Sequence, residues 1–167
     1  DAVALNCLIP PDQDPHTYQA KPSDRDAVDT ADLVFYALLN FEPAIISMAT
    51  ASESEAPKIA LHDEAVQQVI EVEEEGEVNP DPHIWHDIEN GLAMVTLIQD
   101  NLVTIDPDNA DVYTQNAEQL MAELQVLDDW IPEQIATIPE SQRRLITTHD
   151  AMGYYAQAYG LTVEGTL

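Results

Sequence analysis

The chain has 167 residues, of which 32 are Asp or Glu and only 5 are Lys or Arg, so its formal net charge at pH 7 is −27. A field of that sign repels nucleic acid and anionic membrane surfaces and attracts cations, which argues against a nucleic-acid-binding function. Hydrophobic residues make up 45% of the chain, enough for the core of one domain or one and a half. The acidic excess itself mainly predicts a solvated, salt-adapted surface.

No apolar run approaches the roughly 18–20 residues of a membrane span. No basic start precedes an apolar stretch, so we expect no signal peptide, and we expect the chain to be cut at its front and to stop inside a strand at Leu167. The single cysteine, Cys7, excludes an intrachain disulfide. Cys7 is expected to pack as a small apolar side chain, because it lies in an alternating segment.

Strand-like and helix-like segments alternate along the chain, which predicts an α/β fold with a mostly parallel sheet. Residues 1–9 alternate like a strand, and Ser23 is expected to begin a short helix that ends near Thr30. Residues 32–39 form a continuous apolar run, which is typical of a strand covered on both faces.

The next segments contain a helix, a strand and an acidic stretch. Pro43 lies in the first turn of the predicted helix, and residues 58–61 read as another short strand. Residues 63–79 carry many glutamates. Because like charges spaced this closely repel one another, we interpret 63–79 as a mobile, solvated loop.

Two amphipathic helices follow, with apolar residues at spacings of three and four, as expected for helices that bury one face in the core. These residues are Ile88, Leu92, Val95, Ile98, Leu102 and Ile105 in the first helix, and Tyr113, Ala117, Leu120, Leu124, Leu127 and Ile131 in the second. Pro132 is expected to kink or restart the second helix. Residues 144–148 then read as a strand, residues 151–159 as a helix closed by Gly160, and Leu161 as the start of another strand.

The chain has five histidines, and three of them are placed where a metal site could form. His16 and His83 each follow an Asp-Pro pair, while His149 lies between a predicted strand and a helix. Ligand sites in open parallel α/β folds lie beyond the carboxyl ends of strands, so at least two of the three histidines are on the expected edge. Because neutral imidazole is a good zinc ligand, we predict a divalent transition metal, zinc first, held by His16, His83 and His149.

Four aspartates near these histidines could accept a hydrogen bond from the ring nitrogen that does not bind metal. They are Asp14, Asp81, Asp87 and Asp150. An aspartate beside a helix start is as often simply a cap.

The other two histidines are expected to have ordinary roles. His62 ends a predicted strand beside Asp63 and is interpreted as capping it. His86 could approach the same metal only if its segment were helical, which Pro82 disfavours. A further possibility is that His86 lends the site an outer ligand.

Three segments resemble the ligand-bearing segments of the zinc- and manganese-binding solute-binding proteins of ABC transporters, the family that includes zinc-uptake and adhesin-type lipoproteins. They are DPHTYQAKPSD (14–24), DPHIWHD (81–87) and THDAMGYYAQAYGL (148–161). Two further segments, ADLVFYALLNFEP (31–43) and DPDNADVYTQNAEQL (106–120), resemble the family's intervening segments. The resemblance implies that His16, His83 and His149 are the first, second and third ligands. Histidine at the third position favours Zn²⁺, with Mn²⁺ as the alternative.

The resemblance also implies an architecture and a role. It implies an N-terminal α/β lobe over residues 1–105, a long linking helix over 106–140 and the incomplete beginning of a C-terminal lobe over 141–167. The family's fourth ligand, an aspartate, is expected beyond Leu167. A monomeric, periplasmic or cell-surface protein would capture the metal between its lobes and pass it to an ABC transporter permease, without catalysis.

Two other functions remain open from the residues alone. Three histidines with an open fourth position also describe the site of a zinc-dependent hydrolytic enzyme, in which the pKa of bound water falls to about 7. The chain has no HExxH motif, however. The other possibility is a non-metal adhesion or interaction module, which calorimetry with zinc and manganese would distinguish.

Overall fold

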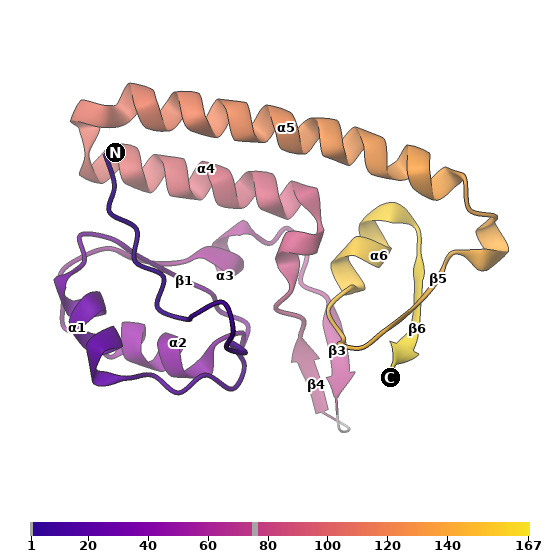
Figure 1. The fold of residues 1–167 in the computed structure, drawn as a ribbon, viewed down its shortest axis with the longest axis horizontal. Helices are drawn as coiled ribbons and strands as arrows, with labels where there is room; N and C mark the ends of the chain where they lie inside the picture. Colours follow the sequence, from indigo (N-terminus) through magenta and orange to yellow (C-terminus); the bar gives the residue numbers. More distant parts are fainter. Residues whose placement is uncertain (1, 75–76) are drawn as a thin grey trace.

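Two long helices lie side by side along one edge of the molecule (Figure 1). In the computed structural model, which describes residues 2–74 and 77–167, these are α4 (Ile88–Ile105) and α5 (Ala110–Ala136), joined by a 3₁₀ turn at Pro107–Asn109. The expected helices are confirmed, but α5 continues through Pro132, so the predicted restart there is wrong. A proline removes one backbone donor, and Ile131 beside it is buried against Ile88, which holds that turn in place.

The N-terminal part contains three helices and one pair of parallel strands. They are α1 (Pro22–Thr30), β1 (Val34–Tyr36), α2 (Pro43–Thr50), β2 (Lys58–Ala60) and α3 (Leu61–Ala65), with Val34 of β1 opposite Lys58 of β2. Helix α1 begins at Pro22 rather than Ser23, because the Asp24 carboxylate accepts the backbone N–H of Lys21 at 2.7 Å and closes the first turn there. Strand β1 is shorter than the predicted range 32–39, and Leu39, the last residue of that range, has a positive φ of 55°.

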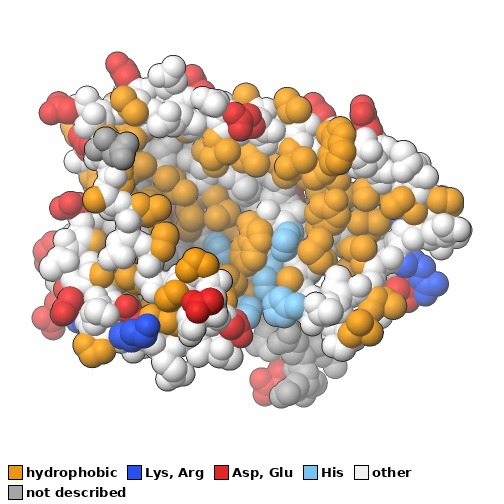
Figure 2. Space-filling model, viewed as in Figure 1, with side chains coloured by type: hydrophobic (Ala, Val, Ile, Leu, Met, Phe, Trp, Pro, Cys, Tyr) orange, Lys and Arg blue, Asp and Glu red, His pale blue; other side chains and the backbone are white. Residues whose placement is uncertain are grey.

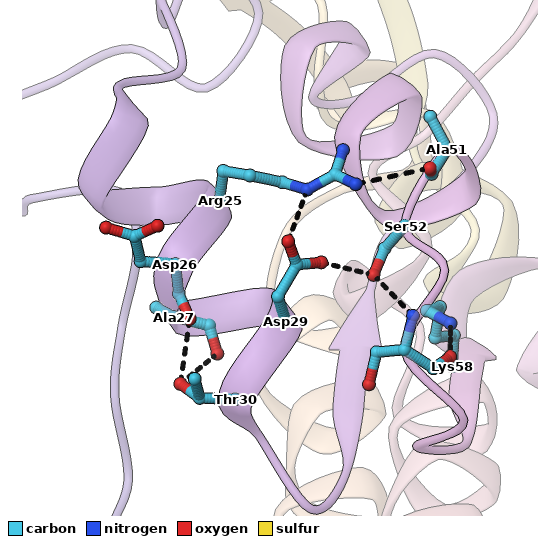
Figure 3. A network of polar contacts seen from close by, with 9 residues as sticks. Arg25, Asp26, Ala27, Asp29, Thr30, Ala51, Ser52 and Lys58 are labelled. Carbon is cyan, nitrogen blue, oxygen red and sulfur yellow. Dashed lines mark hydrogen bonds and ion pairs between the residues drawn. The ribbon is translucent and has the colours of Figure 1, made fainter.

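A polar network joins α1 to the segment after α2 (Figure 3). Asp29 accepts from Nε of Arg25 at 2.7 Å and from Oγ of Ser52 at 2.6 Å. These groups are solvent-exposed, so the network adds little stability. The buried core of this part of the chain is formed by Tyr18, Val28, Val34, Ile45 and Met48.

The acidic stretch 63–79 is not a loop throughout, contrary to the sequence prediction. Strand β3 (Glu71–Glu74) pairs antiparallel with β4 (Glu77–Pro80), while Glu75 and Gly76 lie outside the described residues. At the base of this hairpin, the N–H of Asp81 donates to the carbonyl of Ile70 at 2.7 Å. Backbone pairing and this anchoring outweigh the repulsion on which the loop interpretation was based.

The C-terminal part is a second parallel pair around a short helix. Strand β5 (Arg144–Thr147) pairs with β6 (Thr162–Thr166), and α6 (Gly153–Tyr159) connects them. Gly160, with φ of 69°, ends α6 as predicted. The hydroxyl of Tyr159 donates to Asp128 of α5 at 2.8 Å and ties this part to the long helix. The α/β class is therefore confirmed, with two parallel pairs and one antiparallel hairpin among the described residues.

The N-terminal segment pairs with no strand within the described residues, so the strand predicted for 1–9 is wrong. Val3 and Leu5 instead line an apolar groove of about 510 Å³ against α4 and α5. Cys7 is exposed rather than packed, because its segment has no covering layer.

The predicted apolar faces of the long helices are only partly buried. Tyr113, Ala117 and Ile131 of α5 are buried, but Leu120 and Leu127 of α5 and Ile105 at the end of α4 are exposed, so the core assignment is wrong for these three residues. Helix α4 covers only part of the surface of α5. No helix within the described residues combines the length and apolar content needed to cross a membrane.

Candidate metal centre

Three histidines from distant parts of the chain meet in one cluster. His16, His83 and His149 each offer a ring nitrogen, and these atoms all lie within 4.8 Å of one another. Figure 2 shows histidine side chains gathered near the centre of one face. The Nε2 atoms of His83 and His149 are 3.1 Å apart. Two nitrogens bound to tetrahedral zinc at about 2.0–2.1 Å would be separated by about 3.3 Å, so the spacing fits a shared metal ion.

His83 is held by Asp81, two residues earlier. The Asp81 Oδ1 atom accepts both the backbone N–H of His83 at 2.9 Å and its Nδ1 at 2.7 Å. A carboxylate oxygen accepts, so this contact favours the His83 tautomer with the proton on Nδ1 and the lone pair on Nε2. Nε2 is the atom that faces His149. The contact therefore selects the tautomer that can bind a metal in the cluster.

His16 is positioned by a turn and not by a strand end, contrary to the sequence argument. Asp14 accepts the backbone N–H of His16 at 3.0 Å and the hydroxyl of Thr17 at 3.2 Å. The Asp14 carboxylate thus orders the backbone and does not contact the imidazole ring. The ring of His16 lies edge-on to Phe41, with centroids 5.2 Å apart and an interplanar angle of 82°.

His149 follows β5, as predicted, and is the exposed member of the cluster. Its carbonyl accepts from Oγ1 of Thr147 at 2.8 Å and from the N–H of Ala151 at 3.0 Å, which fixes the backbone at the end of the strand. In the described part of the chain, no hydrogen bond joins Asp150 to a cluster ring. Asp87 accepts from the N–H of Glu89 and caps α4. Of the four aspartates considered, Asp81 is the one that contacts a cluster ring.

Helix α6 approaches the hairpin base closely, and this contact brings His149 to His83. A Cβ atom on Gly153 would lie 2.7 Å from Oδ2 of Asp81, so only glycine fits at this point without a shift. The hydroxyl of the buried Tyr154 donates to the carbonyl of Asp81 and accepts from the N–H of Ile70, both at 3.2 Å. Neither residue could be assigned to the site from the sequence, because nothing in the sequence shows that α6 packs on the Asp81 turn.

His62 and His86 lie outside the three-histidine cluster. His62 is a buried residue of α3, not a strand cap, because the chain turns into a helix immediately after β2. Burial and, to a smaller extent, the electrostatic effect of nearby His83 lower the pKa of His62 to about 4, while a hydrogen bond with the Pro82 backbone opposes this change. The segment of His86 is a 3₁₀ helix, Ile84–His86, although Pro82 was expected to disfavour helix there.

Phe41 lies beside the cluster, a position that was not predicted from the sequence. Its ring centroid lies 5.2 Å from that of His16, 6.2 Å from that of His83 and 5.1 Å from that of Trp85. The sequence held one signal for its position. Asn40 directly before it is a residue type that tolerates the left-handed conformation of tight turns.

Comparisons with known proteins give a consistent family. A family model described as zinc-uptake complex component A, periplasmic (ZnuA), matches residues 1–167. The manganese-binding lipoprotein MntA of Halalkalibacterium halodurans is 34% identical over 163 residues, covering 97% of this chain and 52% of that protein. The iron ABC transporter substrate-binding lipoprotein MtsA of Streptococcus pyogenes is 30% identical over 168 aligned positions, covering 96% of this chain and 54% of that protein.

A solved structure resembles most of the described fold. The periplasmic zinc binding protein TroA of Treponema pallidum matches with a TM-score of 0.81 and 29% identity, covering 91% of this chain and 54% of that chain. The chain spans about half the length of the curated relatives it matches. The metals named for these proteins differ, being manganese, iron and zinc.

Proposed function

This chain belongs to the periplasmic zinc-uptake component A (ZnuA) family, and on that basis we propose that it binds a divalent transition metal outside the cytoplasm for delivery to the permease of an ABC transporter. The observation that carries the proposal is the cluster of His16, His83 and His149, whose ligand atoms lie within 4.8 Å of one another. The metal is the cargo of the protein, and the three imidazoles would hold it.

Zinc is the proposed cargo, with manganese as the alternative. Three neutral nitrogen donors suit zinc better than manganese, which prefers oxygen ligands. The Asp81 carboxylate supports metal binding by His83, because its contact with Nδ1 leaves Nε2 for the metal. The names of the relatives include both manganese and zinc, so the choice of zinc rests on the three nitrogen donors.

We also propose that the metal lies where two lobes meet. Residues 1–105 would form the N-terminal lobe, residues 106–140 the linking helix and residues 141–167 the beginning of a second lobe. His16 and His83 come from the first of these parts, and His149 from the last. The exposed side of His149 leaves a position for a further ligand, and we propose that the protein acts as a monomer.

Titration calorimetry with zinc and with manganese tests the proposed site. The unchanged chain should bind one equivalent of metal, and His83→Ala should lose most of the affinity because the best-ordered ligand is removed. His86→Ala is the matched control, since His86 is three residues away and outside the cluster. If neither metal binds, or if both variants titrate like the unchanged chain, the proposed site is wrong.

We propose capture without catalysis. Asp81, the carboxylate in contact with the cluster, is engaged with Nδ1 on the far side of His83 and is not placed to activate a metal-bound water. Incubation of the zinc-loaded chain with a simple activated ester should give no more hydrolysis than zinc alone. Turnover that depends on both the protein and zinc, and that is lost in His83→Ala, would favour the hydrolytic enzyme instead.

A further inference from the structure

The loop after β1 is strained next to the histidine cluster. Leu39 and Asn40 have φ of 55° and 63°, so two consecutive residues other than glycine occupy the left-handed region. This conformation is unfavourable for a bulky side chain such as that of leucine, and it persists only where the surroundings enforce it. Strain of this kind beside a binding site points to a residue that must be held in one position.

Three contacts enforce the conformation of this loop. The buried Glu42 accepts the backbone N–H of Ala37 through Oε1 at 2.6 Å, and the N–H of Phe41 donates to the carbonyl of Leu38 at 3.1 Å. Leu39 packs against the buried cluster that contains Ile84. Burial raises the pKa of Glu42, and the hydrogen bond with Ala37 opposes that change. The residue that this closed loop presents to the histidines is Phe41.

Phe41 closes one side of the three-histidine cluster. Its ring is nearly perpendicular to the rings of His16 and His83, with interplanar angles of 82° and 86°. Trp85 packs against Phe41 with centroids 5.1 Å apart. The ring of His149 forms the third corner of the cluster, with its centroid 5.6 Å from that of His16 and 4.9 Å from that of His83, and His149 is exposed. The phenyl ring therefore lies along the His16–His83 side, and the open side of the cluster is at His149.

From this arrangement we propose that Phe41 limits the number of ligands around the bound metal and so favours zinc over manganese. The inference rests on the proposed function, namely that the three histidines bind metal. Zinc is satisfied by four ligands in a tetrahedron, whereas manganese takes six ligands, mainly oxygens and water. A phenyl ring has no donor atom and occupies space in which additional water ligands would have to lie. It thus disfavours the larger coordination sphere without touching the metal.

The test compares Phe41→Ala with the unchanged chain and with Phe41→Leu, which keeps an apolar side chain of similar bulk. Zinc and manganese affinities are measured by calorimetry, and Co²⁺ serves as a spectroscopic probe, because four-coordinate cobalt absorbs visible light much more strongly than six-coordinate cobalt. In Phe41→Ala we expect weaker cobalt absorption and a preference for zinc over manganese that is about tenfold smaller, on the scale of changes around metal ligands. Phe41→Leu should retain both properties, and circular dichroism should show that each variant is folded.

The outcomes separate this inference from the proposed function. If the unchanged chain binds neither zinc nor cobalt, the proposed function fails and the inference fails with it. If the unchanged chain binds both metals but its cobalt complex absorbs weakly, the coordination number is not restricted and only the inference is overturned. The same conclusion follows if Phe41→Ala binds metal with unchanged cobalt absorption and an unchanged ratio of zinc to manganese affinity. Since the cobalt spectrum of the unchanged chain is informative by itself, the test does not depend on the folding of one variant.

Discussion

The Nδ1 atom of His83 lies 2.7 Å from Oδ1 of Asp81, and these side chains are only 6% and 1% exposed. Burying a carboxylate is unfavourable unless it is paired and hydrogen-bonded; Oδ1 of Asp81 is paired with His83, while its buried Oδ2 has no hydrogen-bond partner among the described residues. The same carboxylate packs against Gly153 of α6. The buried Asp81 carboxylate therefore orients His83, one of the proposed ligands. It also contacts α6, the helix that follows His149, which is another proposed ligand.

Replacing Asp81 with Asn should weaken zinc binding about 10- to 100-fold. The amide can present an N–H to His83 Nδ1, which would move the ring proton to Nε2, the atom proposed to bind metal. Competition between the protein and a zinc chelator measures the change. Asp14→Asn is the control, because Asp14 accepts from the backbone of His16 and asparagine supports the same type of turn. Equal affinities for the two variants would contradict this role of Asp81.

Gly153→Ala should destabilise the protein by about 1–3 kcal/mol, as expected for overpacking in a tight contact. The added Cβ would lie 2.7 Å from Oδ2 of Asp81, so either α6 or the Asp81 turn must move. Gly91→Ala is the matched control within a helix: nothing lies within 4 Å of its added Cβ, and the change should stabilise α4 by roughly 0.5–1 kcal/mol. Urea unfolding measures both effects, and a stabilised Gly153→Ala variant would contradict a tight contact between α6 and Asp81.

Because of His62, the free energy of unfolding should decrease as the pH falls below neutral. Its folded-state pKa is about 4, below the ordinary value of 6.5, so between these values the unfolded chain binds more protons than the folded chain. That contribution is complete at pH 7 and is progressively lost as the pH falls from 6.5 towards 4. The difference between pH 7 and pH 5 amounts to about 2 kcal/mol at most. Urea unfolding at the two pH values should show a smaller difference for His62→Asn, and an equal difference in both proteins would rule out this source.

Salt should raise the melting temperature. The net charge of −27 makes the folded chain repel itself, and increasing KCl from about 0.1 M to 1 M shortens the screening length from about 10 Å to 3 Å. Thermal unfolding followed by circular dichroism measures the shift. A melting temperature that stays constant or falls across this range would show that the acidic surface does not limit stability.

Much of the local structure followed from periodicity and turn chemistry. The apolar spacing in residues 88–105 and the glycine at 160 depend only on neighbours in sequence, and both predictions agree with the structure. The predictions that failed needed knowledge of a partner. The alternating pattern of residues 2–9 is compatible with a strand, yet a strand forms only where another strand offers its hydrogen bonds. The glutamates of β3 and β4 suggested a loop because repulsion can be seen in a sequence, whereas backbone pairing cannot.

The sequence by itself determined which histidines to consider, since their motifs can be recognised without coordinates, and the structure brings those three together. That they bind metal stays a prediction. Only the tertiary structure decided that Asp81, and none of the other three candidate aspartates, contacts a histidine ring of the cluster. It also decided that Gly153 permits α6 to approach Asp81, and that Phe41 closes one side of the cluster. The physical reason is distance along the chain: local spacing specifies helices and turns, but a contact between residues many positions apart depends on how several elements pack at once.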